Sequence, residues 1–572
     1  NDGAATGAAT EADWQGGDLE GVTQMIESGY FTELGINALW ISPFNTNPAG
    51  SYIAGDGEHM VSGYHGYWPT EPRQVEPRFG GEEALTEMIE AAHGAGIRVM
   101  ADFVVNHVHE DHIYAQEHPE WFNQGCICGT SECDWTERRL DCLFMDYMPD
   151  LDWKNRDASE QVISDALWWA ETFDLDGLRV DAVKHVDDHA VNNLATRINE
   201  KFEATGTDFY LKGETAMGWS GDSLEDNAEQ YETINRYIGD DGLDGQADFV
   251  LYHAVVDNVF TTGSRDYQHL DYWTNRSQDQ YTEGAIMVPY LGSHDSPRFL
   301  SRIDNDGTQW NQWQEQSLPS TPSASSYESA KQGIAWLLTT PGAPMLYMGD
   351  EFGQHGGADP DNRRMLNFTL SEQQNDLKDF TAEIANLRLE NEPLRRGVYS
   401  TFHAETDLLA YEMTTEDDSL LVVLNRGAVT QLESDYDEVI FGDATLFDNA
   451  LAISANSVTI VAKSSPVDNQ TNQSNNTDNG NSSQTNNTTN QTDNSTGDNQ
   501  TDNNSEETKI CQGCCGATSE VPISEQCPVA ACIECDELDG KSSNWVRNIL
   551  AIFVLIAVVV FIGMSRKSGD NH

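Results

Sequence analysis

Four short apolar runs, each closed by polar or charged residues, constrain the fold of this chain more than any other feature. The runs and their endings are residues 97–107, 177–181, 209–214 and 286–295. Each has the composition of a buried strand with its polar side chains at the C-terminal end. Parallel strands that alternate with helices bring such ends to one mouth of a (β/α)8 barrel. The pattern therefore predicts an α/β barrel with one active site at that mouth.

The second run, residues 177–180, delivers Asp181 to the end of its strand. Arg179 lies two residues earlier, so the alternation of a strand sends both side chains to the same face. A guanidinium beside a carboxylate favours the ionised carboxylate. The alternative is a buried ion pair that only holds the strand in place. Carboxylates at two other strand ends, Glu214 and Asp295, favour a catalytic site instead.

These segments resemble the four short motifs of the α-amylase family, glycoside hydrolase family 13, in the family's order. The matching segments are Asp102–His107, Gly177–His185, Gly213-Glu214 and Ser293–Asp295. The resemblance spans residues 16–463. It implies that Asp181 is the nucleophile, Glu214 the general acid/base and Asp295 the carboxylate that orients the sugar hydroxyls.

The resemblance also implies which side chains hold the sugar at the bond that is cleaved. Arg179, His107 and His294 match residues of the cleavage subsite. Lys184 and His185 match the pair on the leaving-group side in α-amylases. We therefore expect these five side chains to surround the two reacting carboxyl groups.

Three further residues are candidate sugar contacts. Tyr67 matches a family tyrosine that stacks on the sugar, and an aromatic face suits the C–H side of a pyranose. The alternative for Tyr67 is a loop aromatic that lies as a lid over the core. Asp359 and Arg363 resemble the family segment that binds the neighbouring sugar, although a surface ion pair would also explain them.

Retaining glycoside hydrolysis requires these residue types independently of the resemblance. It uses two carboxyl groups about 5 Å apart, one ionised to attack the anomeric carbon and one protonated to release the leaving oxygen. Arg179 favours the ionised form of Asp181, and Glu214 among like charges is expected to keep its proton. The two carboxyl groups thus take different roles through their surroundings.

The strand–helix rhythm predicts the domain boundaries. Residues 1–106 and 153–394 form the catalytic barrel, residues 107–152 an inserted domain after the third strand, and residues 395–463 an antiparallel β-sandwich. No strand-like run precedes Trp14, which departs from the family pattern. Because the first ten residues lack the regions of a signal peptide, we interpret the chain as a mature form.

The inserted segment contains four cysteines and a candidate calcium site. Four cysteines allow three pairings, and for an exported protein we expect two disulfides rather than zinc. The cysteines are Cys126, Cys128, Cys133 and Cys142. The resemblance implies a structural calcium held by Asn106, Asp150 and the backbone carbonyl of His185. Such oxygen ligands suit calcium, and the alternative for each residue is a cap or a turn.

The charge balance excludes one class of partner. The chain of 572 residues has 31 Lys and Arg against 95 Asp and Glu, a formal net charge of −64. Such a surface repels phosphate backbones, so nucleic acid is not an expected partner. Acidic, lysine-poor surfaces suit high salt, where screening removes self-repulsion, and we expect a halophile. The alternative is an acidic secreted protein.

The last hundred residues predict a membrane-anchored stalk. Residues 464–508 are a polar, disordered linker with Asn-x-Ser/Thr acceptors, and residues 509–540 are a cysteine-rich module with disulfides or zinc. Residues 546–564 are an apolar run that we expect to cross a membrane, with 565–572 in the cytoplasm. A buried core helix is the alternative. The acceptors include Asn469, Asn472, Asn481, Asn490, Asn494 and Asn499.

Together these features predict a cell-surface enzyme with an extracellular catalytic domain that cleaves α-1,4 links of starch, glycogen or maltooligosaccharides with retention. Lys184 and His185 favour an endo-acting α-amylase. A cyclomaltodextrinase or an α-glucosidase that acts on short substrates remains an alternative. A non-catalytic glucan-binding scaffold is a further alternative, against which the intact Asp181, Glu214 and Asp295 argue. The sequence does not indicate an oligomeric state.

Overall fold

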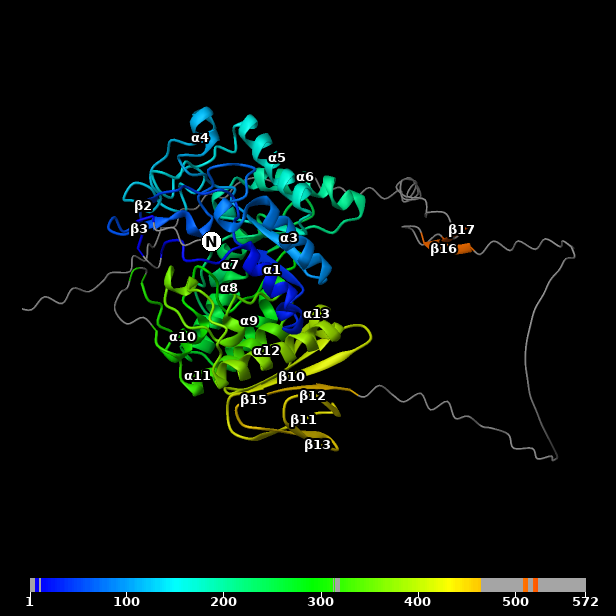
Figure 1. Ribbon diagram of the computed structural model, residues 1–572. Helices are drawn as coiled ribbons and strands as arrows, with labels where there is room; N and C mark the ends of the chain where they lie inside the picture. The colour runs from blue at the N-terminus through cyan, green and yellow to red at the C-terminus, as the bar shows by residue number, and fades with distance from the viewer. Residues whose placement is uncertain are drawn as a thin grey trace, which may run out of the picture. The chain divides into compact units, whose positions relative to one another are not determined.

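The computed structural model describes residues 6–9, 12–311, 313 and 319–463, together with the backbone of 508–512 and 518–522. The chain forms two compact units, Asn1–Asn469 and Gln470–His572. The first unit holds the predicted catalytic barrel and β-sandwich, and its course is shown in blue to yellow (Figure 1).

A parallel sheet with the strand order β1-β4-β5-β6-β7 forms the centre of the first unit. Its strands are β1 (Ala38–Ile41), β4 (Arg98–Phe103), β5 (Gly177–Val180), β6 (Tyr210–Gly213) and β7 (Gly245–Gln246). Single parallel bridges, Ala247 to Val288 and Tyr290 to Met345, continue the sheet to two further positions. This chain-ordered parallel arrangement confirms the predicted α/β barrel. Among the described residues no ladder joins β1 to the segment of Met345, and no strand precedes β1.

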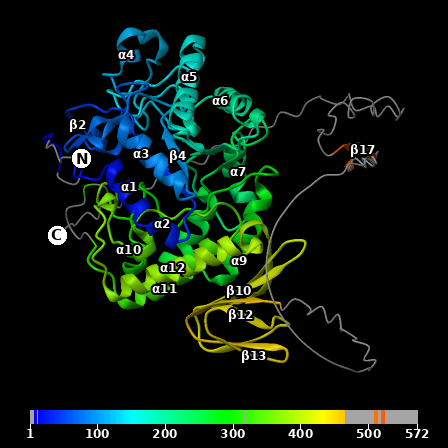
Figure 2. The same ribbon diagram turned by 45° about the vertical axis from the view of Figure 1, so that its right-hand side comes forward.

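Helices connect the strands and cover the outside of the sheet (Figures 1 and 2). The helical segment between residues 19 and 33 is interrupted at Gly29, whose φ of 81° lies in the left-handed region that glycine adopts easily. The helices are α1 (Leu19–Glu27), α2 (Tyr30–Glu33), α3 (Gly81–Gly94), α5 (Arg156–Phe173), α6 (Asp188–Lys201), α7 (Ala228–Asn235), α8 (Phe249–Leu251), the π-helix η8 (Tyr252–Thr261), α9 (Tyr267–Ser277), α10 (Phe299–Asp304), α11 (Ala324–Thr339), α12 (Glu372–Glu390) and α13 (Glu392–Arg396).

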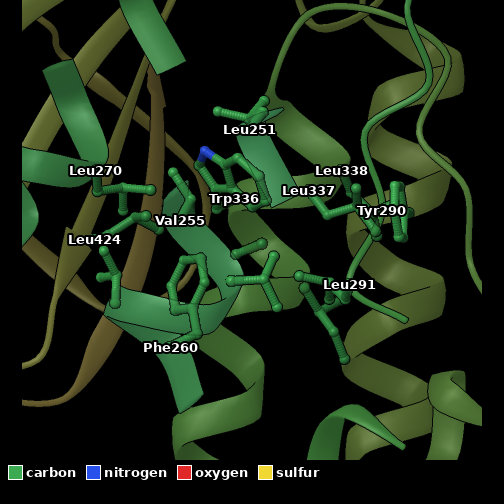
Figure 3. Packing of buried hydrophobic residues seen from close by; sticks show 14 of the residues in the cluster. Leu251, Val255, Phe260, Leu270, Tyr290, Leu291, Trp336, Leu337, Leu338 and Leu424 are labelled. Carbon is green, nitrogen blue, oxygen red and sulfur yellow. The ribbon is translucent and has the colours of Figure 1, made fainter. Parts of the chain in front are cut away.

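Two large apolar clusters stabilise this unit. One packs α3, α5 and α6 against β4, β5 and β6. The other joins η8, α9 and α11 to the C-terminal sheet, and Figure 3 shows Trp336 of α11 beside Val255 of η8. Trp336 is fully buried, and its indole nitrogen donates to the Thr274 hydroxyl at 2.9 Å. The barrel and the C-terminal sheet therefore share one core.

The predicted C-terminal antiparallel β-structure is confirmed, and its strands lie between Val398 and Ala462. One sheet has the order β12-β15-β10-β9-β8 and the other β11-β14-β13, with antiparallel pairing. Residues Leu420 to Asn425 are all buried because one face of β10 packs on the barrel and the other on the second sheet. The strands are β8 (Val398–Ala404), β9 (Leu408–Thr414), β10 (Ser419–Asn425), β11 (Thr430–Glu433), β12 (Glu438–Phe441), β13 (Ala444–Phe447), β14 (Ala450–Ile453) and β15 (Ser457–Ala462).

The inserted segment lies between β4 and α5, as predicted. It has little regular structure apart from α4 (Ile113–Glu117) and the 3-10 helix η4 (Pro119–Trp121). Two disulfides hold it together, Cys126 with Cys133 and Cys128 with Cys142, which confirms disulfides over zinc and selects one of the three pairings. A short hairpin, β2 (Ser51–Ile53) and β3 (Met60–Ser62), projects from the loop after β1.

In the second unit the described backbone forms an antiparallel hairpin of β16 (Thr508–Gln512) and β17 (Thr518–Pro522). The predicted linker up to residue 507, its Asn-x-Ser/Thr acceptors, most of the cysteine-rich module and the apolar run 546–564 with its tail lie outside the described residues. No helix in the described part of the chain is long and apolar enough to cross a membrane.

Candidate active site

The sheet register places the predicted catalytic residues at neighbouring strand ends. Val180 of β5 pairs with Gly213 of β6, so the next residues, Asp181 and Glu214, leave the barrel side by side. One layer deeper, Arg179 pairs with Asp102 of β4 on one side and with Lys212 of β6 on the other. A row of charged side chains therefore lies directly beneath the two carboxyl groups.

Arg179 is the centre of this cluster. Its side chain is 2% exposed, and its Nη1 lies 2.9 and 3.1 Å from the two carboxylate oxygens of Asp102. The same Nη1 donates to Asp181, and Nη2 lies 2.7 Å from Oε1 of Glu214. One guanidinium thus fixes three carboxyl groups, including the predicted nucleophile and the predicted acid/base.

Burial raises the pKa of Asp181 well above its ordinary value; Arg179 opposes this rise, and the nearby Glu214 and Asp102 add to it. As predicted, Arg179 acts to lower the pKa of Asp181, but burial of the carboxyl group in the substrate-free site raises this pKa by more. Burial likewise raises the pKa of Asp102. The three carboxyl groups share one guanidinium, so mutual repulsion adds to burial in raising the pKa values of Asp181 and Asp102.

The backbone after the nucleophile contributes a further donor. Ala182 has a φ of 47°, an uncommon conformation for a residue with a side chain, and its N–H donates to Oε2 of Glu214 at 3.1 Å. The 3-10 helix η5 (Val183–His185) follows. The strained residue therefore ties the nucleophile's strand to the acid/base.

A second group of predicted residues is linked to the cluster through Tyr67. The Tyr67 hydroxyl donates to Asp102 at 2.7 Å and lies 3.1 Å from Nε2 of His294. His294 also approaches the carboxylate of Asp295 at 3.0 Å, and Nε2 of His107 lies 3.0 Å from the Tyr67 carbonyl. Tyr67 is therefore part of the site. The side chain of Asp295 is 55% exposed, so this carboxylate stands at the rim.

Asp359 and Arg363 extend the site beyond Asp295. Arg363 Nε lies 2.7 Å from Asp359 and donates to the His294 carbonyl at 3.1 Å, while Nη2 lies 3.5 Å from Asp295. The Arg363 side chain is only 15% exposed. A simple surface ion pair does not describe these contacts, because Arg363 joins two residues of the predicted site.

Lys184 and His185 lie at another part of the site, near the loop that follows Glu214. Lys184 Nζ donates to the Ala216 carbonyl at 3.3 Å, on the loop that follows Glu214. Nδ1 of His185 lies 3.2 Å from the Arg139 carbonyl of the inserted segment. The pair thus occupies the boundary between the barrel mouth and the insertion.

The candidate calcium ligands lie apart from the reacting carboxyl groups. Asn106 and Asp150 are buried, their segments are bridged, and Oδ1 of Asp150 has no hydrogen-bond partner. Burial raises the pKa of Asp150 to about 8. A buried carboxylate oxygen without a donor fits a cation. The described residues contain no group of three His, Cys, Asp or Glu side chains suited to a metal, so a cation here would be held by the Asp150 carboxylate together with neutral oxygens.

Three residues of the site received no role from the sequence. Asp102 accepts from Arg179 and Tyr67, and Trp40 of β1 donates its indole N–H to Asp102 at 3.1 Å. Lys212 is buried with its Nζ 3.9 Å from the centre of the Trp40 ring. Only their position in the sequence could have indicated a role, because each of the three lies near the end of an apolar strand.

A parallel α/β barrel that carries carboxyl groups on two adjacent strand ends can supply the nucleophile and the acid/base for cleavage of a glycosidic bond. The family model described as "Alpha amylase, catalytic domain" matches residues 1–402. The chain belongs to the α-amylase family, as its motifs predicted.

Relatives are distant but numerous across this family. The chain is 24% identical over 425 residues to a cyclomaltodextrinase of Thermoanaerobacter pseudethanolicus, covering 72% of this chain and 64% of the relative. It is 26% identical over 431 residues to a maltogenic α-amylase of Bacillus acidopullulyticus, covering 72% and 63%. The chain thus spans a little under two thirds of the length of these curated relatives.

Solved structures support the same fold. The α-amylase of Geobacillus thermoleovorans, solved as a complex with acarbose, aligns with a TM-score of 0.63 at 24% identity, covering 79% of this chain and 93% of the other. A cyclic α-maltosyl-(1→6)-maltose hydrolase of Arthrobacter globiformis aligns with a TM-score of 0.60 at 20% identity, covering 79% and 90%. At these identities the likeness concerns the fold.

Proposed function

We propose that this protein is a retaining α-glucan hydrolase that cleaves α-1,4 links. One observation carries the proposal: Asp181 and Glu214 both contact the guanidinium of Arg179. Contact of both carboxyl groups with one guanidinium favours the narrow separation of retaining enzymes, about 5–5.5 Å, over the wider one of about 6.5–9.5 Å in inverting enzymes.

In this mechanism Asp181 attacks the anomeric carbon as the glycosidic bond breaks, and Glu214 gives its proton to the leaving oxygen. A covalent glycosyl ester on Asp181 results. The ionised Glu214 then takes a proton from water, which attacks the same carbon and releases Asp181 with overall retention. In this proposal Tyr67, His107 and His294 hold the sugar, and Asp295 orients its hydroxyls.

The preferred substrate is the finer part of the proposal. The segment Lys184-His185 favours an endo-acting α-amylase on starch or glycogen. A cyclomaltodextrinase-like activity is the second candidate, because a cyclomaltodextrinase is among the relatives that match most of the barrel. Products from soluble starch, a cyclodextrin and maltotriose distinguish them, since an endo-amylase releases mixed oligosaccharides from starch and a cyclomaltodextrinase prefers the ring.

Calcium is proposed as a structural ion at Asn106 and Asp150, with the His185 carbonyl as a third ligand. The unpartnered Oδ1 of Asp150 supports this assignment. The ion would neutralise the buried carboxylate and fasten the insertion to the end of β4.

The setting of the enzyme is also proposed. The net charge of −64 supports a saline environment, and the apolar run 546–564 supports an extracellular catalytic domain anchored at the cell surface. Detergent-dependent extraction of the full chain, lost on deletion of 546–564, would support the anchor. Free release of the intact chain by salt alone would contradict it.

The decisive experiment uses Glu214→Gln in the full chain. We expect release of reducing ends from starch to fall by at least about 10²-fold, because the leaving oxygen loses its proton donor. Glucan binding, measured by calorimetry, should remain. An unaltered rate in the variant would refute the role of Glu214, and a wild type without hydrolysis but with binding would favour the scaffold alternative.

A further inference from the structure

Two Asn-x-Ser/Thr triplets, the acceptors of N-linked sugar, lie within the first unit and outside the catalytic cluster. They are Asn275-Arg276-Ser277 and Asn367-Phe368-Thr369. A triplet is modified only where a transferase reaches both the asparagine amide and the hydroxyl two residues later, which requires an exposed position. The surroundings of the two triplets differ in this respect.

The first triplet is closed to a transferase. Asn275 lies in α9, and its Nδ2 donates to the hydroxyl of Thr401 in β8 at 2.9 Å. Ser277 is fully buried, and its hydroxyl lies 3.0 Å from the Tyr231 hydroxyl. The nitrogen and the hydroxyl of this triplet are therefore both occupied inside the fold. A sugar on Asn275 would stand between α9 and β8, whether it was attached before or after folding.

The second triplet is open. Asn367 and Thr369 are exposed and lie in the irregular segment between the 3-10 helix η11 (Asp361–Arg363) and α12. Oδ1 of Asn367 accepts from the Thr369 N–H at 3.0 Å, which closes a turn stabilised by the asparagine side chain. In the described part of the chain Nδ2 of Asn367 contacts no acceptor. The turn therefore orders the carboxamide through its oxygen and leaves the nitrogen to solvent.

Two apolar side chains beside Asn367 give a sugar here a surface to cover. Met365 is 53% exposed and Phe368 is 46% exposed. The Phe368 ring is held in place by Tyr30 and Phe352, whose ring centres lie 5.6 and 6.1 Å away. The apolar face of a pyranose suits an exposed aromatic ring. A sugar on Asn367 would thus shield apolar surface that the fold leaves in water.

We propose that Asn367 carries an N-linked glycan and that Asn275 does not. This assignment rests on the proposed extracellular setting and extends it from the tail to the catalytic unit. The sugar donor is an oligosaccharide linked to a polyprenyl phosphate or diphosphate. Nδ2 of Asn367 forms a bond to C1 of the first sugar as the bond from C1 to the donor phosphate oxygen breaks. The amide gives one proton to a base of the transferase, and the lipid phosphate leaves with the bonding electron pair.

Tryptic peptides of the full chain, purified from the organism that produces it, separate the acceptors. Asn367 lies on peptide 365–378, Asn275 on peptide 266–276, and the predicted tail acceptors on peptide 464–509. By mass spectrometry we expect sugar on most copies of the first peptide and none on the second. A bare first peptide beside a glycosylated tail would overturn the proposal and leave the extracellular setting intact. A chain without sugar on any of these peptides would overturn it as well.

A matched pair of variants at Thr369 tests the triplet itself. Thr369→Ala removes the hydroxyl that the transferase recognises and keeps Asn367, whereas Thr369→Ser keeps both. We expect the sugar at Asn367 to be lost in the first variant and kept in the second, with the tail unchanged in both. Sugar that persists in Thr369→Ala would refute the assignment. Starch hydrolysis by the same preparations reports the proposed function separately, because the glycan is measured without reference to activity.

Discussion

Lys212 is the buried cation whose removal should be most informative. It is 3% exposed, and its Nζ contacts the face of Trp40 and lies 3.7 Å from the sulfur of Met345. Burial, together with the charge of Arg179, lowers the pKa of Lys212 to about 7, against the opposing effect of nearby carboxylates such as Glu214. We predict that Lys212→Met stabilises the fold at neutral and lower pH.

The size of this effect follows from the change in pKa. A fall from 10.5 to about 7 corresponds, at about 1.36 kcal/mol per pKa unit, to roughly 5 kcal/mol. Between these values the unfolded chain binds the proton and the folded chain does not, so stability rises with pH. The cost of burying the charged Lys212 is fully present below pH 7 and is gone above pH 10.5.

Urea unfolding of the wild type and of Lys212→Met at pH 6, 8 and 10 measures this directly. Titrating groups far from Lys212 affect both proteins alike, so the difference between the two free energies reports Lys212 together with the charges that act on it. We expect the free energy of unfolding of Lys212→Met to exceed that of the wild type by several kcal/mol at pH 6 and by about 1 kcal/mol at pH 10. A difference that stays constant across this range would refute the idea that Lys212 is buried with a lowered pKa.

Three other changes test separate parts of the molecule. Arg179→Lys should lower kcat at least about 10²-fold with little change in glucan affinity, because an ammonium cannot bridge three carboxyl groups, and initial rates on starch measure it. Removal of calcium with a chelator should lower Tm in the wild type and not in Asp150→Asn, whereas equal shifts would place the ion elsewhere. Replacing Cys128 and Cys142 by serine should cost about 3 kcal/mol, measured by urea unfolding, since the bridge closes a loop of 14 residues.

Much of the site was predictable because strand geometry is local. Short apolar runs predict that β5 ends at Val180 and that β6 ends at Gly213. Parallel pairing of the two strands then brings Asp181 beside Glu214. The role of Asp102 was not predictable in this way. Its contact with Arg179 depends on the register between β4 and β5, which no single run encodes.

Neither the cysteine pairing nor the charge state of the nucleophile could be predicted from the sequence, for different reasons. Three pairings of four cysteines satisfy the same spacing, and the backbone path between Cys126 and Cys142 decides among them. The pKa of Asp181 depends on how far the carboxyl group is enclosed, which is a property of the whole barrel mouth. The alternation of the strand predicted Arg179 as the neighbour of Asp181, but it did not predict how deeply the Asp181 carboxyl group is buried.

The segment 359–363 shows how distant residues complete the site. Asn362 is fully buried, and its side-chain amide donates to the carbonyls of His294 at 2.7 Å and of Ser296 at 2.9 Å. Arg363, the next residue, holds the same His294 carbonyl and faces Asp295. One segment therefore both fixes the loop that carries Asp295 and supplies a charged side chain beside it. The predicted sugar binding at Arg363 and the orientation of Asp295 are thus mechanically linked, so changes at Asn362 should affect the rate of catalysis as well as affinity.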